Sequence, residues 1–488
     1  MSGNISEKKQ GRGIGFFGLV GLVVSSCVGT GVFALTGSIG AVSAPGPALI
    51  AWAIVGAGFF SLALVFSNLK AKRPEIEGIS SYATKGFGNL AGFMSGWGYW
   101  VSAWIGNVAF ATILASTLGY FIPYFLPGNN IGSILLGSAI CWGITLLVWR
   151  GIESASFLNA LIMVAKVAGL AVFALFSLFL FNAGIFTADF WGTVFNNAVA
   201  AGEMGPGAIS LGSVGEQVVN CLIIMMFVFI GLEGAAVVSE RAKNKSQSGR
   251  ATVVGMVVVL VVYICVSVLP YGYMPYSEIA ALDSPAMIYV FEDMAPGWGG
   301  AFLSIAMLVS GFGCWLSFTI LPTETTSLMS QEGLLTSHWN RRNKFNVPTF
   351  SLLMEALCTQ VFLVTLLFTQ DAFAFAYSLC TVTIIITWAF AAAYQVKISV
   401  RERNAAQIAL GVFSLAFLVI GTLLSGWQYL LLSCIAYIPG YLVYARARKA
   451  QLPEGAKLLS RTEMAVMAVV SALAVLAVVL VVVGVISF

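Results

Sequence analysis

Apolar stretches near 20 residues long recur from one end of this chain to the other, and short polar segments separate them. A stretch of that length crosses a bilayer as an α-helix, which satisfies its own backbone hydrogen bonds. The strict alternation that is typical of membrane barrel strands is absent. The pattern therefore predicts an all-α polytopic membrane protein with about thirteen spans, at residues 15–42, 47–69, 90–121, 131–149, 154–181, 216–240, 251–273, 300–330, 348–369, 372–397, 405–424, 427–445 and 463–487.

Lysine and arginine gather in alternate connecting segments. If the N-terminus is cytoplasmic, every one of the 24 basic residues except Lys166 falls on the cytoplasmic side of the predicted spans, as such residues do in membrane proteins. The loops on the other side carry acidic residues instead: Asp189, Glu203, Glu278, Asp283, Glu292, Asp293 and Asp371. One missed or extra helix would mix the two sets, so the charge pattern supports the topology of a multi-pass protein of the cytoplasmic membrane.

The composition excludes several other classes of protein. Only 9% of the residues are charged, against about a quarter in soluble domains. No basic run is dense enough to indicate a nucleic-acid partner. The 8 cysteines lie in apolar stretches without a CxxC pair, and His338 is the one histidine, so we expect no metal site, no cofactor and no enzyme.

Glycine-rich segments interrupt two of the predicted spans. They are residues 25–33 (SSCVGTGVF) in the first span and 227–234 (FVFIGLEG) in the sixth. The two spans are five helices apart and run in opposite senses, which is typical of an inverted repeat with its binding site where the broken helices meet. The predicted divisions are a cytoplasmic tail at 1–14, a first repeat at 15–181, an extracytoplasmic loop at 182–215, a second repeat at 216–397 and additional helices at 398–488.

Such breaks expose helix ends to a ligand. The amides of Gly29, Thr30 and Gly31 would open the outer half of the first span and can hold a carboxylate. Carbonyl groups near Phe227 and Phe229 would end the outer half of the sixth span and can accept an ammonium group. Together they predict a receptor for a zwitterionic α-amino acid. The alternative is that the glycines only allow close helix packing.

The sequence at these breaks resembles a known family. The residues 27–33 (CVGTGVF) and 229–252 (FIGLEGAAVVSERAKNKSQSGRAT) are similar to signatures of the amino acid–polyamine–organocation superfamily, which has the LeuT-type fold. Within it the chain is most similar to the basic amino acid/polyamine antiporters, and among them to bacterial arginine–ornithine antiporters. Further similar segments lie at residues 96–110, 116–123, 187–192 and 429–440.

The resemblance implies roles for particular residues. The substrate-binding positions that it implies are Ser26, Cys27, Gly29, Thr30, Gly31, Tyr99, Ser102, Asn107, Phe227, Phe229, Ile230 and Phe318. Phe227 and Phe318 stand where arginine-handling relatives usually carry tryptophan. A phenylalanine attracts a cation less strongly than a tryptophan does, and it leaves a roomier pocket.

Four acidic or basic residues, Lys166, Glu233, Glu324 and Glu355, lie within predicted spans and away from the span ends, where burial of a charge is costly. Lys166 lies about 18 Å along the fifth span, close to the midplane, and matches a family lysine that replaces sodium. Glu233 lies in the sixth-span break and is a candidate for gating, or for capping the inner half-helix. Glu324 and Glu355 lie toward the cytoplasmic ends of their spans, where either attraction of a cationic substrate or interfacial solvation explains them.

These observations predict a sodium-independent amino acid antiporter of the bacterial cytoplasmic membrane that works by alternating access. The resemblance favours arginine exchanged for ornithine. The alternative in the same class is an amino acid exchanged for its decarboxylated amine, such as histidine for histamine. A channel would need a continuous polar helix face and a nutrient receptor a large soluble domain, and the sequence contains neither.

Overall fold

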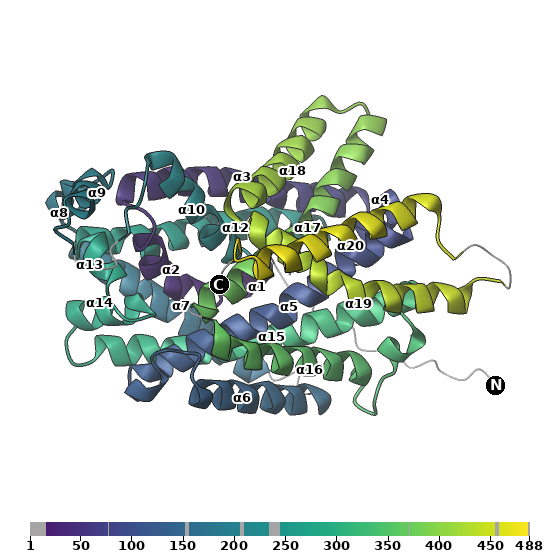
Figure 1. Ribbon diagram of the computed structural model, residues 1–488, viewed down its shortest axis with the longest axis horizontal. Coiled ribbons are helices and arrows are strands. Elements are labelled where there is room, and N and C mark those ends of the chain that lie inside the picture. Colours follow the sequence, from purple (N-terminus) through teal and green to yellow (C-terminus); the bar gives the residue numbers. More distant parts are fainter. Residues whose placement is uncertain are drawn as a thin grey trace.

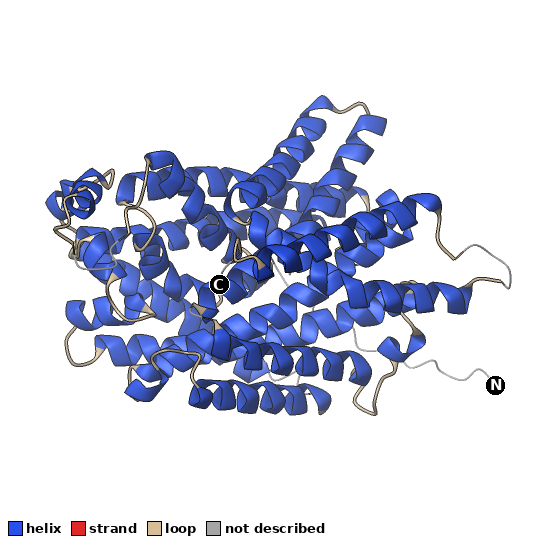
Figure 2. Ribbon diagram, in the orientation of Figure 1, coloured by secondary structure: helices blue, strands red, loops and turns tan. Residues whose placement is uncertain are grey.

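The computed structural model describes residues 16–76, 78–151, 156–204, 209–233, 245–369, 371–453 and 458–486. Within these residues the regular elements are helices, and the single extended pairing is an isolated bridge between Arg342 and Pro348 (Figure 2). The helices that coincide with predicted spans are α1 (Phe16–Cys27) with α2 (Gly31–Gly40), α3 (Pro45–Lys72), α5 (Asn89–Gly119), α6 (Ile131–Trp149), α7 (Ser156–Phe179), α10 (Val214–Phe227), α12 (Lys245–Val268), α15 (Gly299–Gln331), α16 (Thr349–Thr365), α17 (Ala372–Arg401), α18 (Ala405–Ser425), α19 (Trp427–Gln451) and α20 (Arg461–Val482).

Shorter helices connect the long ones. They are α4 (Ser80–Phe87), α8 (Ala183–Ala188), α9 (Thr193–Ala200), α13 (Tyr276–Ala280) and α14 (Ala286–Met294), with 3₁₀ turns at Pro123–Phe125, Leu269–Gly272, Ser337–Asn340 and Leu366–Phe368. In Figure 1 the long helices run side by side along the long axis, and α8, α9, α13 and α14 gather at one end. This is the end to which the sequence assigns the acidic, extracytoplasmic loops.

Ten helices of the described residues are long and apolar enough to cross a bilayer, and α1 with α2, bent by 49°, would make an eleventh as one broken span. The apolar part of α7, Val164–Phe179, and α10 are shorter where they are described. The inner part of the sixth predicted span, from residue 234, and the predicted tail at 1–14 lie outside the described residues. The all-α polytopic class is confirmed, whereas the count of thirteen stays a prediction.

Local sequence explains where several helices begin. At α10 the side chain of Ser213 accepts a hydrogen bond from the Glu216 amide, and the Glu216 carboxylate accepts one from the Ser213 amide. Ser460 and Glu463 repeat this reciprocal arrangement at α20. These side chains satisfy first-turn amides that have no acceptor inside their own helix, so the sequence fixes each start within a residue or two.

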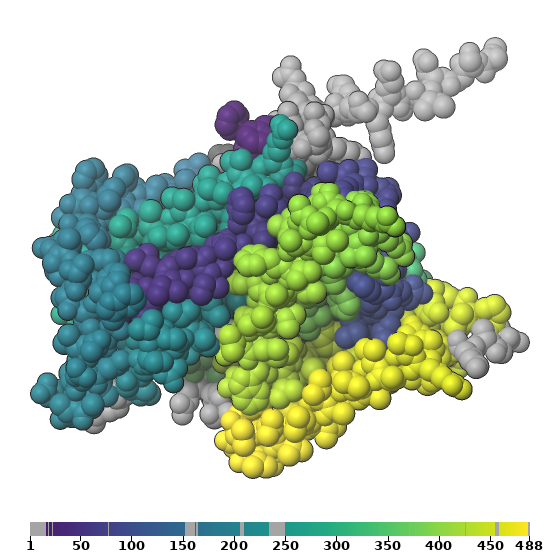
Figure 3. Space-filling model, turned by 90° about the horizontal axis from the view of Figure 1, so that it is seen from above, coloured from purple at the N-terminus to yellow at the C-terminus, as the bar shows by residue number. Residues whose placement is uncertain are grey.

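The long helices differ sharply in how deeply they are packed. In α5, 89% of the most apolar window is buried inside the protein, against 11% in α20. Figure 3 shows α19 and α20, in yellow, along the outside of the molecule beside α18. The helix α5 therefore forms the centre of the bundle, and α20 lies on its periphery.

The helix α12 packs against both halves of the broken first span, α1 and α2. The hydroxyl of Thr36 on α2 donates to Val266 O at 2.8 Å, and Tyr271, just after α12, donates to Thr36 O at 2.7 Å. Farther along α12, Ser267 Oγ accepts a hydrogen bond at 3.0 Å from the indole of Trp52 on α3. The two bonds of Thr36 hold α2 against the end of α12 and the turn that follows it.

Candidate functional site

The break in the first span leaves a helix N-terminus inside the protein. The helix α1 ends at Cys27 and α2 begins at Gly31, with Thr30 as the N-cap residue. Thr30 makes no side-chain cap, and its buried hydroxyl has no hydrogen-bond partner among the described residues. First-turn amides such as those of Gly31 and Val32 have no acceptor within their helix, so this end of α2 suits a carboxylate.

The second break begins where α10 ends, at Phe227. The chain continues as turns in which the amides of Ile230 and Leu232 donate to the carbonyls of Phe227 and Phe229, each at 3.1 Å. Gly231 adopts φ +110, and its amide donates to the Glu233 carboxylate at 3.2 Å. A carbonyl oxygen has two lone pairs, so those of Phe227 and Phe229 keep one for a further donor.

The two breaks lie directly against each other. A β-carbon on Gly231 would be 2.3 Å from the carbonyl oxygen of Ser26, so only glycine allows this approach. The hydroxyl of Tyr263 on α12 lies 2.7 Å from Cys27 O and 2.8 Å from Val228 O, and its single proton serves one of the two at a time. Tyr263 therefore joins the end of α1 to the end of α10.

A cavity of about 20 Å³ lies between the breaks. It is lined by Ser26, Cys27, Gly29, Gly31, Val32, Phe110, Phe227, Val228, Ile230, Cys314 and Phe318. The rings of Phe110 and Phe318 pack edge to face, with centroids 5.0 Å apart. This volume holds about one water molecule, so the central cavity is too small for an amino acid in this conformation.

The structure thus gathers seven of the twelve predicted substrate-binding residues around one cavity: Ser26, Cys27, Gly29, Gly31, Phe227, Ile230 and Phe318. Thr30 does not line it, because its methyl group packs toward Gly311 of α15. The ring of Phe229 stacks on Phe59 at 4.3 Å and also points away. For Thr30 and Phe229, a role through the backbone stays a prediction.

The predicted residues of α5 make other contacts. The hydroxyl of Ser102 donates to Tyr99 O within the same helix at 2.8 Å. The amide of Asn107 donates to the buried carboxylate of Glu355 at 3.1 Å. These three α5 residues lie outside the lining of the central cavity, and their contact with substrate stays a prediction.

The ammonium group of Lys166 is buried beside the end of α1. Lys166 is 3% exposed, and its Nζ donates to Ser25 O at 3.1 Å and lies 3.0 Å from Cys314 Sγ. The last carbonyls of a helix carry partial negative charge, which a cation stabilises. The protein therefore places its own cation at the inner side of the first break.

Sequence reasoning missed five residues of the site, namely the lining residues Val32, Phe110, Val228 and Cys314, and Tyr263, whose hydroxyl joins the two breaks. Tyr263 and Cys314 gave no signal, because each sits within an apolar run where a tyrosine or cysteine is ordinary. Phe110 lies within the segment 96–110 that resembles the family, three residues after Asn107, but its ring was not singled out. Its place in the cavity lining, against the ring of Phe318, depends on how α5 packs against α15.

A second, larger cavity of about 440 Å³ lies beside loops that the sequence predicts to be extracytoplasmic. Residues of α2, α5 and α17 line it together with residues 280–286 of the loops, and Asp371 contributes a carboxylate. The ring of Phe227 lies 5.4 Å from that of Tyr377 and 6.3 Å from that of Phe373. These three rings stand between the outer cavity and the central one.

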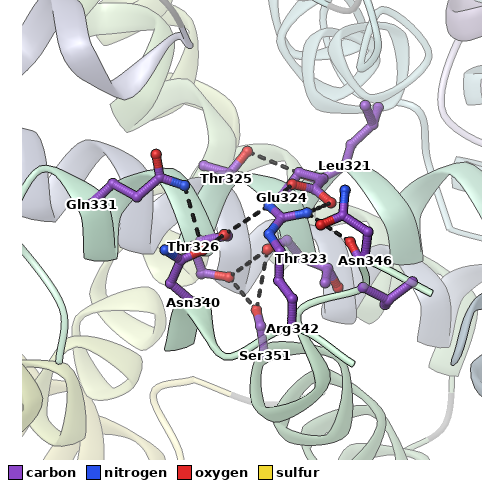
Figure 4. A network of polar contacts seen from close by, with 12 residues as sticks. Leu321, Thr323, Glu324, Thr325, Thr326, Gln331, Asn340, Arg342, Asn346 and Ser351 are labelled. Atoms are coloured by element: carbon purple, nitrogen blue, oxygen red, sulfur yellow. Dashed lines mark hydrogen bonds and ion pairs between the residues drawn. The ribbon is translucent and has the colours of Figure 1, made fainter. Parts of the chain in front are cut away.

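A polar network lies near the C-terminal end of α15 (Figure 4). Arg342 binds the Glu324 carboxylate with both terminal nitrogens, at 2.6 and 3.2 Å, and donates to Asn346 O. Thr326 on α15 bonds to Ser351 on α16. Glu324 is partly exposed and ion-paired, as expected of a residue at the surface of the membrane.

Comparison with known proteins identifies the family. A profile described as amino acid permease matches residues 14–424. The chain is 48% identical to the arginine/ornithine antiporter of Latilactobacillus sakei over 91% of its own length and 92% of that protein. It is 37% identical to the arginine/ornithine antiporter of Pseudomonas aeruginosa, over 88% and 90% of the two chains. It is also 32% identical to the arginine/agmatine antiporter of Chlamydia abortus, over 90% and 91%.

Proposed function

Because this chain belongs to the amino acid permease family, we propose that it is an antiporter that exchanges arginine for ornithine across a bacterial cytoplasmic membrane. The relatives named above carry that activity, or the closely related arginine/agmatine exchange, in their names and align along nearly their whole length. The ten apolar helices fit a multi-pass membrane protein. We propose no enzymatic step.

One observation carries the proposal. The N-terminal end of α2 and the C-terminal end of α10 face a single cavity, at Gly31 and Phe227. The first end supplies amide donors for a carboxylate, and the second supplies carbonyl acceptors for an ammonium group. This pairing suits the α-carboxylate and α-ammonium groups that arginine and ornithine share. The two helix ends therefore bind both substrates without distinguishing between them.

The inverted repeat belongs to the same proposal. We place the first repeat at residues 15–181 and the second at 216–397, with thirteen spans in total and the helices of 398–488 outside the repeats. The support is that both breaks fall at the start of their repeat and meet in space through Gly231 and Ser26. In such folds one group of helices rocks against another around a fixed site.

The arrangement of the two cavities supports a mechanism of alternating access. The outer cavity of about 440 Å³ lies beside loops that are predicted to be extracytoplasmic, and the rings of Phe227, Phe373 and Tyr377 lie between it and the central site. Asp371 places a negative charge there for a cationic substrate. Opening of the aromatic layer would admit substrate, and reorientation of a loaded carrier in both directions gives exchange rather than net flow.

Lys166 supports a transport cycle without sodium. Its ammonium group already satisfies Ser25 O at the end of α1. A sodium ion placed there would meet a like charge in a medium of low dielectric, where repulsion is strong. We therefore assign the role of a fixed cation to Lys166.

A second candidate is the exchange of an amino acid for its decarboxylated amine. Two phenylalanines, Phe227 and Phe318, border the central cavity, and the relative from Chlamydia abortus is named for arginine/agmatine exchange. An amine lacks the carboxylate, so it would leave the α2 amides without an anion. The first candidate uses both helix ends for both substrates and is preferred for that reason.

Counterflow in proteoliposomes tests the proposal. Vesicles loaded with unlabelled ornithine should take up labelled arginine rapidly, whereas empty vesicles should not. Vesicles loaded with agmatine or histamine should take up their parent amino acids slowly or not at all. Uptake into empty vesicles at the same rate would contradict exchange, and uptake driven best by an amine would favour the second candidate.

A further inference from the structure

A carboxylate without a cationic partner lies deep in the helix bundle, on the cytoplasmic side of the central cavity. Glu355 of α16 is 1% exposed, and neither of the two ion pairs found among the described residues includes it. Its oxygens face neutral groups instead. Asn107 Nδ2 donates to Oε1 at 3.1 Å, and Thr323 Oγ1 lies 3.1 Å from Oε2.

These neutral partners supply fewer hydrogen-bond donors than the Glu355 carboxylate can accept. The hydroxyl of Thr323 also lies 2.7 Å from Thr319 O, and one hydroxyl proton cannot serve both oxygens. The Oδ1 atom of Asn107 is buried without a partner among the described residues. A carboxylate accepts about four hydrogen bonds, so the group of Glu355, Asn107 and Thr323 has vacant acceptor positions.

Such a group is costly unless something compensates it. An ionised carboxylate in an apolar interior needs a counter-charge or several donors, and the described helices around Glu355 provide neither in full. An arrangement of this kind is typical of a binding site that is completed by its ligand. The ligand that completes it must supply positive charge and N–H donors.

The carboxylate lies on the path from the central cavity. Asn107 precedes Phe110 by three residues on α5, about 4.5 Å along the helix, and Thr323 follows Phe318 by five residues on α15, about 7.5 Å. The rings of Phe110 and Phe318 line the central cavity. A long side chain that extends from the cavity past these rings therefore points toward Glu355.

We propose that Glu355, with Asn107 and Thr323, forms the subsite that binds the cationic end of the substrate side chain, a guanidinium or a primary ammonium group. This inference rests on the proposed exchange of arginine for ornithine and names what selects the two. Both side chains carry their charge beyond three methylene groups, and the faces of Phe110 and Phe318 attract a cation on its way. A guanidinium group has enough N–H donors, and the width, to donate to the Glu355 carboxylate and to Asn107 Oδ1 at the same time. The smaller ammonium group donates to one of these two acceptors.

Citrulline provides the sharpest test, because its ureido group has nearly the shape of a guanidinium without the charge. We would measure competition by arginine and by citrulline against labelled ornithine uptake into ornithine-loaded proteoliposomes. The wild-type protein should prefer arginine. Glu355→Gln should lower the preference for arginine over citrulline at least about tenfold, mainly through weaker arginine binding. An unchanged preference in Glu355→Gln would overturn the inference while leaving the proposed exchange intact.

Two further variants control for other effects. Glu355→Met replaces the carboxyl by an apolar group of similar volume, which buried positions often tolerate, and should lose the preference as well. Glu324→Gln removes a carboxylate of the same helix bundle that is already paired with Arg342, and should keep the wild-type preference. Equal loss in Glu324→Gln would mean a general electrostatic effect and would also overturn the subsite.

Binding can be read without transport. Arginine should raise the midpoint of thermal unfolding of the purified wild-type protein more than citrulline does, and Glu355→Gln and Glu355→Met should abolish that difference. A difference that persists in a folded variant would refute the subsite. If the wild-type protein exchanges neither arginine nor ornithine, the proposed function itself is wrong. The measurement on the wild-type protein alone shows this, independently of the variants.

Discussion

The backbone of Gly231 lies against the carbonyl oxygen of Ser26, so close that a β-carbon would come within 2.3 Å of that oxygen. Gly231 also adopts φ +110, a conformation that L side chains rarely adopt. Two independent constraints therefore require glycine where the two broken segments cross. The geometry of the central cavity depends on this one crossing.

Gly231→Ala should separate the two segments and strongly reduce exchange. The backbone strain alone costs about 1–3 kcal/mol, and the contact with Ser26 O adds to it. Counterflow and the thermal unfolding midpoint should both fall. Gly143→Ala is the matched control, because Gly143 lies exposed on α6 with nothing within 4 Å of an added β-carbon. Normal exchange by Gly231→Ala would show that the crossing is not part of the transport site.

Tyr263→Phe should weaken the connection between α1 and α10. The change removes one hydroxyl and leaves Cys27 O or Val228 O without its donor, which costs roughly 1–3 kcal/mol for a buried group. We expect a lower unfolding midpoint and slower exchange, with both measured on purified protein. Tyr124→Phe, at a side chain that is 59% exposed, should change neither. If Tyr263→Phe behaves like that control, the hydroxyl does not couple the two breaks.

Lys166 predicts that the exchange does not depend on sodium. Arginine uptake into ornithine-loaded vesicles should proceed at equal rates in sodium and in choline buffers, because the ammonium group already binds the end of α1. Lys166→Met should leave Ser25 O without its charged donor and lower the exchange rate in both buffers. A strict requirement for sodium in the wild-type protein would exclude the role assigned to Lys166.

The ring of Phe318 should contribute to binding of the guanidinium. A cation over an aromatic ring gains about 0.5–2 kcal/mol, so Phe318→Leu should weaken competition by arginine roughly twofold to thirtyfold. Phe179→Leu, at an 82% exposed ring on α7, should have no effect. Unchanged arginine affinity in Phe318→Leu would place the guanidinium elsewhere.

Phe318→Trp separates the two candidate functions at the same position. An indole attracts a cation more strongly than a phenyl ring, so arginine binding should improve by up to about tenfold if the guanidinium passes this ring. An imidazole amino acid would instead be crowded and bind more weakly. Competition by arginine, ornithine, histidine and histamine, before and after the change, distinguishes these cases.

The sequence determined the class of protein and the location of the breaks. Charge in the loops and apolar length in the spans are properties of short segments, so they can be read along the chain. The breaks were visible because glycines, which disfavour a continuous helix, cluster there, at Gly29, Gly31 and Gly231. Seven predicted residues met at one cavity because they flank these breaks or face them from α15.

Hydropathy did not reveal which helices form the centre. The most apolar window, in α20, has a mean hydropathy of 3.1 and is 11% buried, whereas α5 has 1.5 and is 89% buried. The reason is physical. Lipid tails are as apolar as the protein interior, so the hydropathy of a span does not depend on whether it packs against lipid or against protein.

Only the tertiary structure decided the side-chain partnerships of the site. Tyr263 meets Cys27 across 236 residues, and Asn107 meets Glu355 across 248. Both pairs depend on the rotation of one helix about its axis relative to another, and packing of many side chains sets that rotation. A single sequence records that a glutamate or tyrosine lies within a span, but the fold alone determines which group it faces.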